Sequence, residues 1–496
     1  MPVPGSILTV LAIGIPWLAG VLILRADRHA RLIGFSAALV SVVASGLLLW
    51  TTPARESLSE ALMLLFSSLT LGATLVIPQR DCKARTISGI LFLLGATLLA
   101  YSTQDLMVLL VAWILSTLPF FPKRWFQSRT WRPRLGLVLS SAALTFAIGF
   151  IAVNGQTTSI ARLRGQAPGG MIAFWLLVAA VIFRKGICPA HAWVADAADG
   201  GPAIPTALLL NGHFGALLVA KLIGPLFPDS ARDMFPVLSY LALATALYVA
   251  IRALTETSPR RLVAFLALSQ SACILAGLES RTAEGITGAL VHWMVVTVST
   301  MGLLSILRLL EVRFGENLSA SAHLGLAEQA PRLAVFFVVF GLALVGLPGT
   351  LSFCSQDLLI HGTLRSHPQT GLLLPVAIAM NAVSVFRLFV RLFLGKRRTG
   401  FTVMADALPR ERWTLTVGVL FVVLGGLFPS AIVSLRSAEA ETISQTAHAG
   451  IHFSRARCTN PAARPTTVTV NGLQSSPRHR PSSRRLMMNA GNGKRI

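Results

Sequence analysis

Residues 184–221 read RKGICPAHAWVADAADGGPAIPTALLLNGHFGALLVAK. In this stretch one apolar run ends in two adjacent cations, Arg184 and Lys185, and a second apolar run follows after a short polar segment. Gly186 and Pro189 lie at the junction, and both residue types interrupt helices. Irregular backbone at membrane depth is tolerated only where it is buried in protein or lines a polar cavity. The stretch therefore predicts a broken membrane helix with charged groups beside the break.

The composition indicates a polytopic membrane protein. Of the 496 residues, 54% are hydrophobic and 13% are charged, and the mean hydropathy is +0.68. Soluble domains carry about a quarter charged residues, so this balance excludes a soluble globule and a disordered chain. The formal net charge of +23 is concentrated in residues 455–496 and in short loops, and cationic loops are what sets membrane topology. We therefore expect a lipid bilayer, and no nucleic acid, around this chain.

No metal or cofactor is expected to be bound by this chain. Its five cysteines are scattered without a C-x-x-C pair, which argues against a zinc or iron–sulfur site. The sequence also contains no P-loop and no G-x-G-x-x-G fingerprint. Redox or nucleotide chemistry would therefore have to reside on partner proteins.

A transmembrane helix needs about 20 apolar residues, and on that criterion the sequence predicts about fourteen spans. The predicted spans are 7–24, 32–50, 58–78, 87–101, 105–122, 135–153, 171–187, 203–227, 235–254, 262–279, 285–310, 332–353, 371–394 and 413–434. Cationic residues gather in alternate connections, which are 80–85, 123–134, 252–261 and 396–398. The positive-inside rule predicts that these connections are cytoplasmic and that both termini are outside. Residues 1–440 are expected to form the membrane domain, and the basic segment 441–496 a disordered tail.

Several motifs, in order along the chain, resemble those of one membrane-protein family. Within the quoted stretch, the matching positions are Pro189, His191, Trp193, Asp196, Ala197, Gly201, Pro202, Ala207 and Leu208. The further motifs are SPRRLVAFLALS at 258–269, GITGAL at 285–290, GLPGTLSF at 346–353 and the helix ending from Arg387 to Gly395. Over residues 60–435 the chain resembles the antiporter-like, proton-conducting subunits of respiratory complex I and of Mrp cation/proton antiporters. Its length is closer to the M- and N-type subunits than to the L-type.

The resemblance implies an all-α fold with two inverted five-helix repeats, which correspond to the spans from 87 to 227 and from 235 to 394. One helix in each repeat, the seventh and the twelfth span, is expected to be broken near the membrane midplane. The interrupting residues are Gly186 and Pro189 in the first repeat, and Gly346, Pro348 and Gly349 in the second. Paired interruptions in corresponding halves point to a transport site.

The resemblance also implies a proton pathway of titratable groups, from which this sequence departs. Ile114 stands where the family has an acid in the fifth span. Arg184 stands at the register of a family lysine, with Lys185 beside it. Because arginine does not lose its proton in a protein, we favour Lys185 as the proton carrier and Arg184 as a fixed charge. The alternative is that both cations are topology anchors whose head groups reach the interface.

Titratable groups lie close to two other altered positions. Gly215 replaces a family lysine in the eighth span, where His213 and Lys221 are the nearby candidates. Histidine titrates near neutral pH and can relay protons; the alternative is an inert, hydrogen-bonded histidine inside the bundle. Val296 replaces a family histidine in the eleventh span, and His292 lies about one turn earlier on the same face.

The last candidates belong to the twelfth and thirteenth spans. Gln356 takes the position of the family's glutamate or lysine, and Asp357 and His361, one turn apart, form a candidate acid–base pair. The alternative is that this segment is a helix end emerging into water. Arg387 is placed within a span, where Asp357 is its expected partner. A purely structural ion pair is the alternative there.

Three functions fit these observations. The first is a proton- or cation-translocating subunit of a complex I-like NADH:quinone oxidoreductase or Mrp-type assembly in the bacterial inner membrane, with other membrane subunits as partners. The second is the membrane subunit of a DAB-type inorganic carbon pump, in which proton flow favours bicarbonate accumulation and a cytoplasmic zinc protein does the chemistry. The third is a conduction-dead paralogue that acts as a scaffold. In each case the chain has no enzymatic active site of its own.

Overall fold

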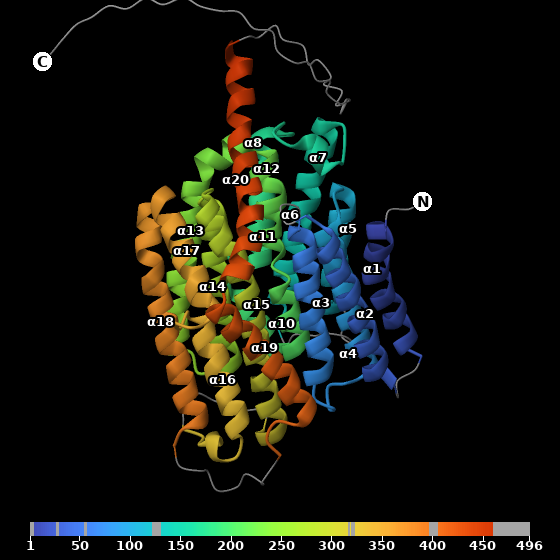
Figure 1. Cartoon of the computed structure of the whole chain (residues 1–496), viewed down its shortest axis with the longest axis vertical. Coiled ribbons are helices and arrows are strands. Elements are labelled where there is room, and N and C mark those ends of the chain that lie inside the picture. Colours follow the sequence, from blue (N-terminus) through green and yellow to red (C-terminus); the bar gives the residue numbers. More distant parts are fainter. Residues whose placement is uncertain are drawn as a thin grey trace, which may run out of the picture. The chain divides into compact units, whose positions relative to one another are not determined.

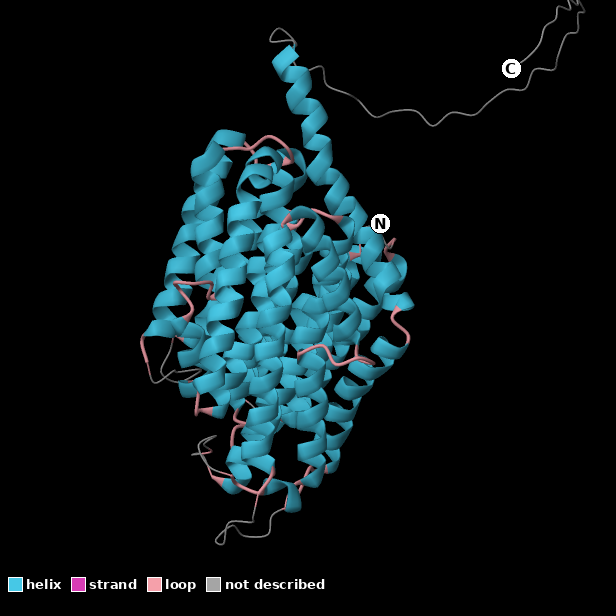
Figure 2. Cartoon of the chain, turned by 90° about the vertical axis from the view of Figure 1, so that its left-hand side faces the viewer, coloured by secondary structure: helices cyan, strands magenta, loops and turns pink. Residues whose placement is uncertain are grey.

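The computed structural model describes residues 4–25, 29–53, 57–121, 130–315, 318, 323–395 and 405–459. Helices dominate these residues, and no β-strand occurs among them (Figures 1 and 2). A single isolated bridge pairs Asp105 with Ser159 in the part of the chain so described. The expected all-α fold is confirmed.

The helices run along the chain with short connections. The first seven are α1 (Pro4–Ile23), α2 (Ala30–Thr51), α3 (Leu58–Val76), α4 (Ala84–Ser102), α5 (Leu106–Thr117), α6 (Arg132–Gly155) and α7 (Ile160–Leu163). The next seven are α8 (Gly170–Lys185), α9 (Ala192–Gly200), α10 (Ala203–Asn211), α11 (Phe214–Leu218), α12 (Gly224–Leu226), α13 (Pro228–Thr255) and α14 (Pro259–Glu279). The last six are α15 (Ala283–Phe314), α16 (Pro331–Leu344), α17 (Leu351–Ser366), α18 (Pro368–Phe393), α19 (Pro409–Leu427) and α20 (Ser430–Thr459).

Many of these helices are long and apolar enough to cross a bilayer. Ten single spans meet that criterion within the described residues, and an eleventh is obtained if α19 and the first part of α20, bent by 80°, count as one. Two shorter apolar helices, Leu106–Phe120 and Pro331–Leu344, add to these. The chain is therefore a multi-pass membrane protein. The number of fourteen spans and the inverted repeats stay predictions.

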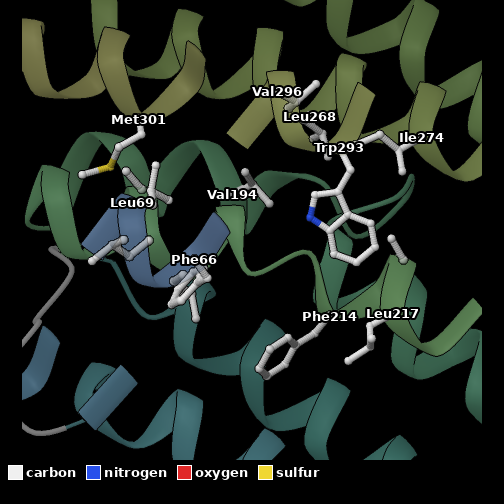
Figure 3. Packing of buried hydrophobic residues seen from close by; sticks show 14 of the residues in the cluster. Phe66, Leu69, Val194, Phe214, Leu217, Leu268, Ile274, Trp293, Val296 and Met301 are labelled. Carbon is white, nitrogen blue, oxygen red and sulfur yellow. The ribbon is translucent and has the colours of Figure 1, made fainter. Parts of the chain in front are cut away.

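The core of the bundle lies around α14 and α15. Both helices are buried along nearly their whole length, whereas α1, α2 and α18 bury only a minority of their residues. These three lie toward the two sides of the view in Figure 1, away from the middle. Their large apolar side chains, such as Leu18 and Leu372, are 67% and 70% exposed, as expected for helices that face lipid. Figure 3 shows buried apolar side chains of the core, among them Trp293 and Val296 of α15, with Phe214 and Leu217 of α11 on the facing side.

Two helices are interrupted where glycine and proline predicted a break. α8 ends at Lys185, Gly186 has a φ of +72°, and α9 begins at Ala192. α16 ends at Leu344 and α17 begins at Leu351, with Gly346 at a φ of +84° between them. These left-handed φ values are strained for residues with a Cβ atom.

A third interruption was not foreseen from the sequence. α10 ends at Asn211, His213 has a φ of +42°, and residues Val219–Ile223 form a π-helical turn before α12. A non-glycine residue with positive φ is uncommon outside turns and functional sites. The backbone is therefore irregular at two neighbouring places, after α8 and between α10 and α12.

The predicted domain boundary at residue 440 falls inside a helix. α20 continues to Thr459. Its Glu439 pairs with Arg436 one turn earlier and accepts a 2.6 Å hydrogen bond from Ser57, which ties the first part of α20 to the bundle. The division into a membrane domain and a tail stays a prediction. The low hydrophobicity of this segment gave no sign of the helix, because its contact with the bundle is polar. Residues 460–496 of the predicted tail lie outside the described residues, as do most of the predicted cationic connections 123–134 and 396–398.

Candidate functional site

A buried lysine–histidine pair lies beside the break between α8 and α9. Lys185 Nζ and His213 Nδ1 are 2.7 Å apart, and the two residues are only 6% and 4% exposed. The left-handed backbone at His213 aims its ring toward α8, and the ring also packs edge-on against Trp293 of α15, with centroids 5.5 Å apart. The Nε2 atom of His213 has no hydrogen-bond partner in the described protein. One imidazole nitrogen therefore contacts the ammonium, and the other has no partner among the described residues.

Gly215 explains how the lysine fits. A Cβ atom at this position would lie 2.3 Å from Lys185 Cγ and 3.0 Å from its Cδ. The aliphatic part of Lys185 therefore fills the space that a side chain on α11 would occupy. The glycine at this register, where the resemblance implies a lysine, thus leaves room for the lysine of α8.

Arg184 makes its own contacts, which do not involve the lysine–histidine pair. Its Nη2 donates a 2.7 Å hydrogen bond to Ser116 Oγ of α5, and its guanidinium lies 5.1 Å from the Trp113 ring centroid and 4.9 Å from that of Phe214. Such cation–π contacts are stronger when the cation is desolvated, and Arg184 is 7% exposed. Neither Arg184 nor Lys185 reaches the bundle surface, so the geometry favours interior charges over topology anchors. Ile114, the altered acid position, is 37% exposed and belongs to another face of α5.

A small cavity borders these groups. Its volume is about 30 Å³, and its lining includes both cations, Asn211, His213 and Ser271. A polar cavity of this size holds a water molecule. Asn211 Oδ1 accepts a 2.7 Å hydrogen bond from Thr300 of α15. The cavity can therefore connect the lysine–histidine pair with polar groups of the central helices.

A second polar cluster lies at the other broken helix. His292 Nε2 is 2.9 Å from Gln270 Oε1, and His292 Nδ1 is 3.1 Å from Ser355 Oγ of α17. Gln356 Nε2 donates a longer, 3.4 Å bond to the same Gln270 oxygen. His292 and Gln356 thus lie in one buried network, as sequence reasoning expected of interior groups. Gln270 was missed, although a lone amide within the apolar run 262–279 could have marked it.

Asp357 and His361 do not join this network. Their side chains pair with each other at 3.3 Å, but they are 59% and 62% exposed on the outer face of α17. The expected pairing of Asp357 with Arg387 is wrong, because Arg387 Nη2 instead donates to the carbonyls of Ala253 and Glu256, at 3.0 and 2.6 Å. Arg387 thereby satisfies backbone oxygens at the end of α13, which have no partner within that helix.

Lys221 has a similar structural contact. Its Nζ atom donates to the carbonyl oxygens of Tyr101 and Thr103, at 2.6 and 2.8 Å. These carbonyls end α4, where a cation complements the negative end of the helix dipole. Lys221 therefore lies away from the lysine–histidine pair, although both residues border the irregular segment between α10 and α12.

An open polar basin lies at the end of the bundle where α9, α10, α14 and the α3–α4 connection meet. Its volume is about 780 Å³, and its lining carries the cations Arg80, Lys83, Arg85, Arg260 and Arg308 together with Asp81, Asp199 and Glu311. Ion pairs hold its walls, with Arg308 bound to Asp81 at 2.6 Å and Arg260 bound to Glu311.

The aspartate of the sequence motif supports the same end of the bundle. Asp196 is 5% exposed and accepts from Arg132 of α6 at 3.3 Å and from Arg261 of α14 at 3.2 Å. Arg260 also donates to the Gly201 carbonyl at 2.9 Å. The motif residues therefore fix α9 against two membrane helices and shape the basin wall. These contacts give Asp196 and Gly201 a structural role, whether or not they take part in transport.

Fold and site together define a helical multi-pass membrane protein with two helix breaks, one beside buried cations and the other beside a buried cluster of histidine and glutamine. The family described as NADH:quinone oxidoreductase/Mrp antiporter, transmembrane region, matches residues 134–382. That match covers half of the chain, so the chain belongs to this family.

Relatives with known names agree with this assignment. The chain is 28% identical to NADH-quinone oxidoreductase subunit N 3 of Streptomyces griseus over 308 residues, which are 60% of this chain and 55% of the relative. It thus spans about half the length of that relative. It is 27% identical to subunit N 2 of Acidobacterium capsulatum over 482 residues, covering 87% of this chain and 97% of the relative.

Solved structures share the fold. A chain of respiratory complex I from Thermus thermophilus superposes with a TM-score of 0.79 at 23% identity, covering 88% of this chain and 99% of that one. A chain of the Mrp complex from Dietzia sp. gives a TM-score of 0.77 at 18% identity, covering 89% and 99%.

Proposed function

We propose that this chain is a proton-translocating membrane subunit of a complex I-like or Mrp-type assembly in the bacterial plasma membrane. The observation that carries the proposal is the buried Lys185–His213 pair beside the break between α8 and α9. A charged group inside the membrane is costly and marks a functional site by default. Family membership and the names of the relatives support the same activity.

The geometry suggests how one proton is held and passed on. Lys185 Nζ and His213 Nδ1 are close enough to share a proton, and a lysine can release its proton whereas an arginine does not. Arg184 keeps its charge next to the pair and repels a second positive charge there. Arrival or loss of a charge nearby would then move the shared proton toward the cavity of about 30 Å³ or away from it.

The polar basin and the second cluster extend this arrangement. The basin carries the basic loop residues that the positive-inside rule assigns to the cytoplasm, so we infer that protons enter from its side. The His292–Gln270–Gln356 cluster offers hydrogen-bonding groups between the two helix breaks. Other membrane subunits are the expected partners, and quinone or ion chemistry on those partners would supply the driving force.

The departure at Ile114 keeps two other functions in view. One is the membrane subunit of an inorganic carbon pump with a cytoplasmic zinc protein as partner, and the other is a scaffold without conduction. Purification in mild detergent, with identification of the co-purifying proteins, separates the assemblies. Quinone-oxidoreductase or Mrp subunits support our proposal, and a zinc protein alone contradicts it.

Proton flux in proteoliposomes containing the purified assembly tests the mechanism. Lys185→Ala is expected to abolish flux while the assembly stays intact, since no proton carrier remains on α8. Arg184→Lys keeps the positive charge and is expected to retain part of the flux. If Lys185→Ala transports normally while Arg184→Lys is inactive, the guanidinium is the essential group. If neither change matters, the scaffold function is favoured.

A further inference from the structure

One buried carboxyl group is unused by the arrangement described above. Glu279, the last residue of α14, is 4% exposed, and its Oε2 atom has no hydrogen-bond partner in the described protein. The other buried acids of the described residues each accept from an arginine; they are Asp196, Glu311, Glu411 and Glu439. Glu279 forms no ion pair within the described chain.

Glu279 lines a narrow cavity of about 20 Å³. The rest of the lining is apolar and includes Val178 and Ile182 of α8, Ile223 of the π-helical turn and Leu241 of α13. A space of this size accommodates a single water molecule. Because the carboxyl is the one ionisable group in this lining, a water there would find its polar partner in Glu279.

The cavity lies beside the helix break, on the side of the bundle that carries Glu279. Ile187, two residues after Lys185, also lines it. α14 begins at Pro259, which borders the basin, and ends at Glu279, so the carboxyl lies at the other end of a helix of 21 residues. At 1.5 Å per residue, such a helix is about 30 Å long, close to the hydrocarbon thickness of a bilayer.

We propose that Glu279 is the proton-holding group on the outer half of the pathway, between the break after Lys185 and the surface opposite the basin. This inference rests on the proposed function. Glu279 releases its proton to the outer side and becomes a carboxylate. The Lys185 ammonium then transfers a proton through water in the narrow cavity to that carboxylate, and Lys185 is recharged from the basin side. One proton crosses the membrane, and each group returns to its starting state.

The surroundings of Glu279 suit this role. An unpaired carboxylate in an apolar cavity is unfavourable, so the neutral acid is the resting form. The apolar lining keeps the water connection sparse, and narrow hydrophobic constrictions gate by losing water. A carboxyl at this position can thus hold a proton without providing an open leak between the two sides.

Carbodiimide labelling tests the resting state independently of transport. Dicyclohexylcarbodiimide partitions into membranes and reacts with protonated carboxyl groups in apolar surroundings. Native membranes containing the intact assembly are treated at neutral pH, and adducts are located by peptide mass spectrometry. We expect an adduct at Glu279 that is absent in Glu279→Gln, and none at the arginine-paired Glu311. An unmodified Glu279 in membranes where the reagent labels other carboxyls would overturn the proposal.

Proton flux supplies the second readout. Glu279→Gln, which keeps the side-chain shape, is expected to lower flux at least about a hundredfold, the lower end of the effects of losing a proton-transfer group. Glu279→Asp is expected to restore part of it. Glu284→Gln is the matched control, since Glu284 lies at the same end of the bundle but is exposed and paired with Arg365; its flux should equal that of the wild type.

The outcomes separate the two proposals. A wild-type assembly without proton flux overturns the proposed function, whatever the labelling result. Wild-type flux that Glu279→Gln leaves unchanged overturns the assignment of Glu279 alone. Thermal stability of Glu279→Gln equal to that of the wild type shows that a loss of flux does not come from misfolding.

Discussion

The space between Gly215 and Lys185 gives the sharpest quantitative prediction. In Gly215→Ala, the new Cβ atom would lie 2.3 Å from Lys185 Cγ, so that atom must retreat by about 1.1 Å to reach an ordinary contact of 3.4 Å. Cγ is close to the backbone of α8 and cannot swing away freely. A comparable displacement at Nζ would take the 2.7 Å contact with His213 beyond hydrogen-bond range. The substitution should therefore impair both packing and proton transfer.

The stability change is the sum of two opposing effects. Alanine gains up to about 1 kcal/mol over glycine from helix propensity, whereas overpacking a tight core costs about 1–3 kcal/mol. Gly215→Ala should thus be near neutral or destabilising by up to about 2 kcal/mol. Gly149→Ala on α6 is the matched control, because nothing lies within 4 Å of a Cβ atom there. It should be neutral or stabilising, with unchanged proton flux.

A double-mutant cycle isolates the clash. Lys185→Ala removes the Cγ atom, so Gly215→Ala should cost about 1–3 kcal/mol less in that background. The measurement is the free energy of unfolding in mixed detergent micelles, with flux in proteoliposomes as the functional readout. A coupling energy below about 0.5 kcal/mol would refute the reasoning, as would a Gly215→Ala variant that matches Gly149→Ala in both stability and flux.

Three further predictions concern other parts of the chain. A hydrogen bond from Thr158, with smaller contributions from backbone N–H groups, lowers the pKa of the Asp105 carboxyl at the start of α5. The ionised carboxylate therefore stabilises the fold above about pH 4, and this contribution is lost as the pH falls further. Asp105→Asn should accordingly make the melting temperature depend less on pH on the acid side. Arg85→Cys should resist an impermeant thiol reagent added outside intact cells while Glu284→Cys reacts, and the reverse pattern would invert the predicted topology. Asp357→Asn should leave proton flux within about twofold of the wild type, since that carboxyl lies on the outer face of α17; a loss of flux comparable to that of Lys185→Ala would return Asp357 to the pathway.

Local sequence was sufficient for the helical class and for two of the three helix breaks. Hydrophobicity and helix propensity act over consecutive residues, so the apolar runs and the interruptions at Gly186 and Gly346 could be predicted with no knowledge of the neighbours. The same reasoning did not reveal that a helix continues past residue 440. Glu439 of α20 pairs with Arg436 and accepts a hydrogen bond from the distant Ser57, a contact that cannot be recognised from composition.

Family motifs also located the site along the chain, but not its contacts. They directed attention to Lys185, His213 and His292, which the structure brings into buried polar clusters. They did not reveal that Gly215 leaves room for Lys185, or that Gln270 of α14 bonds to side chains of both α15 and α17. Those relations depend on which side chains from separate helices face one another.

What the sequence determined by itself was the membrane class, the helical architecture and the positions of the breaks at Gly186 and Gly346, because each follows from a run of residues acting together. What only the tertiary structure decided was the direction in which each ionisable side chain points. Gln356 and Asp357 are adjacent, yet one is 6% exposed and the other 59%. Successive residues on a helix point about 100° apart, so the packing of α17 against α14 and α15 buries the amide and leaves the carboxylate outside. The same rotational choice leaves Glu279 buried without a partner, which no local pattern in the chain could have shown.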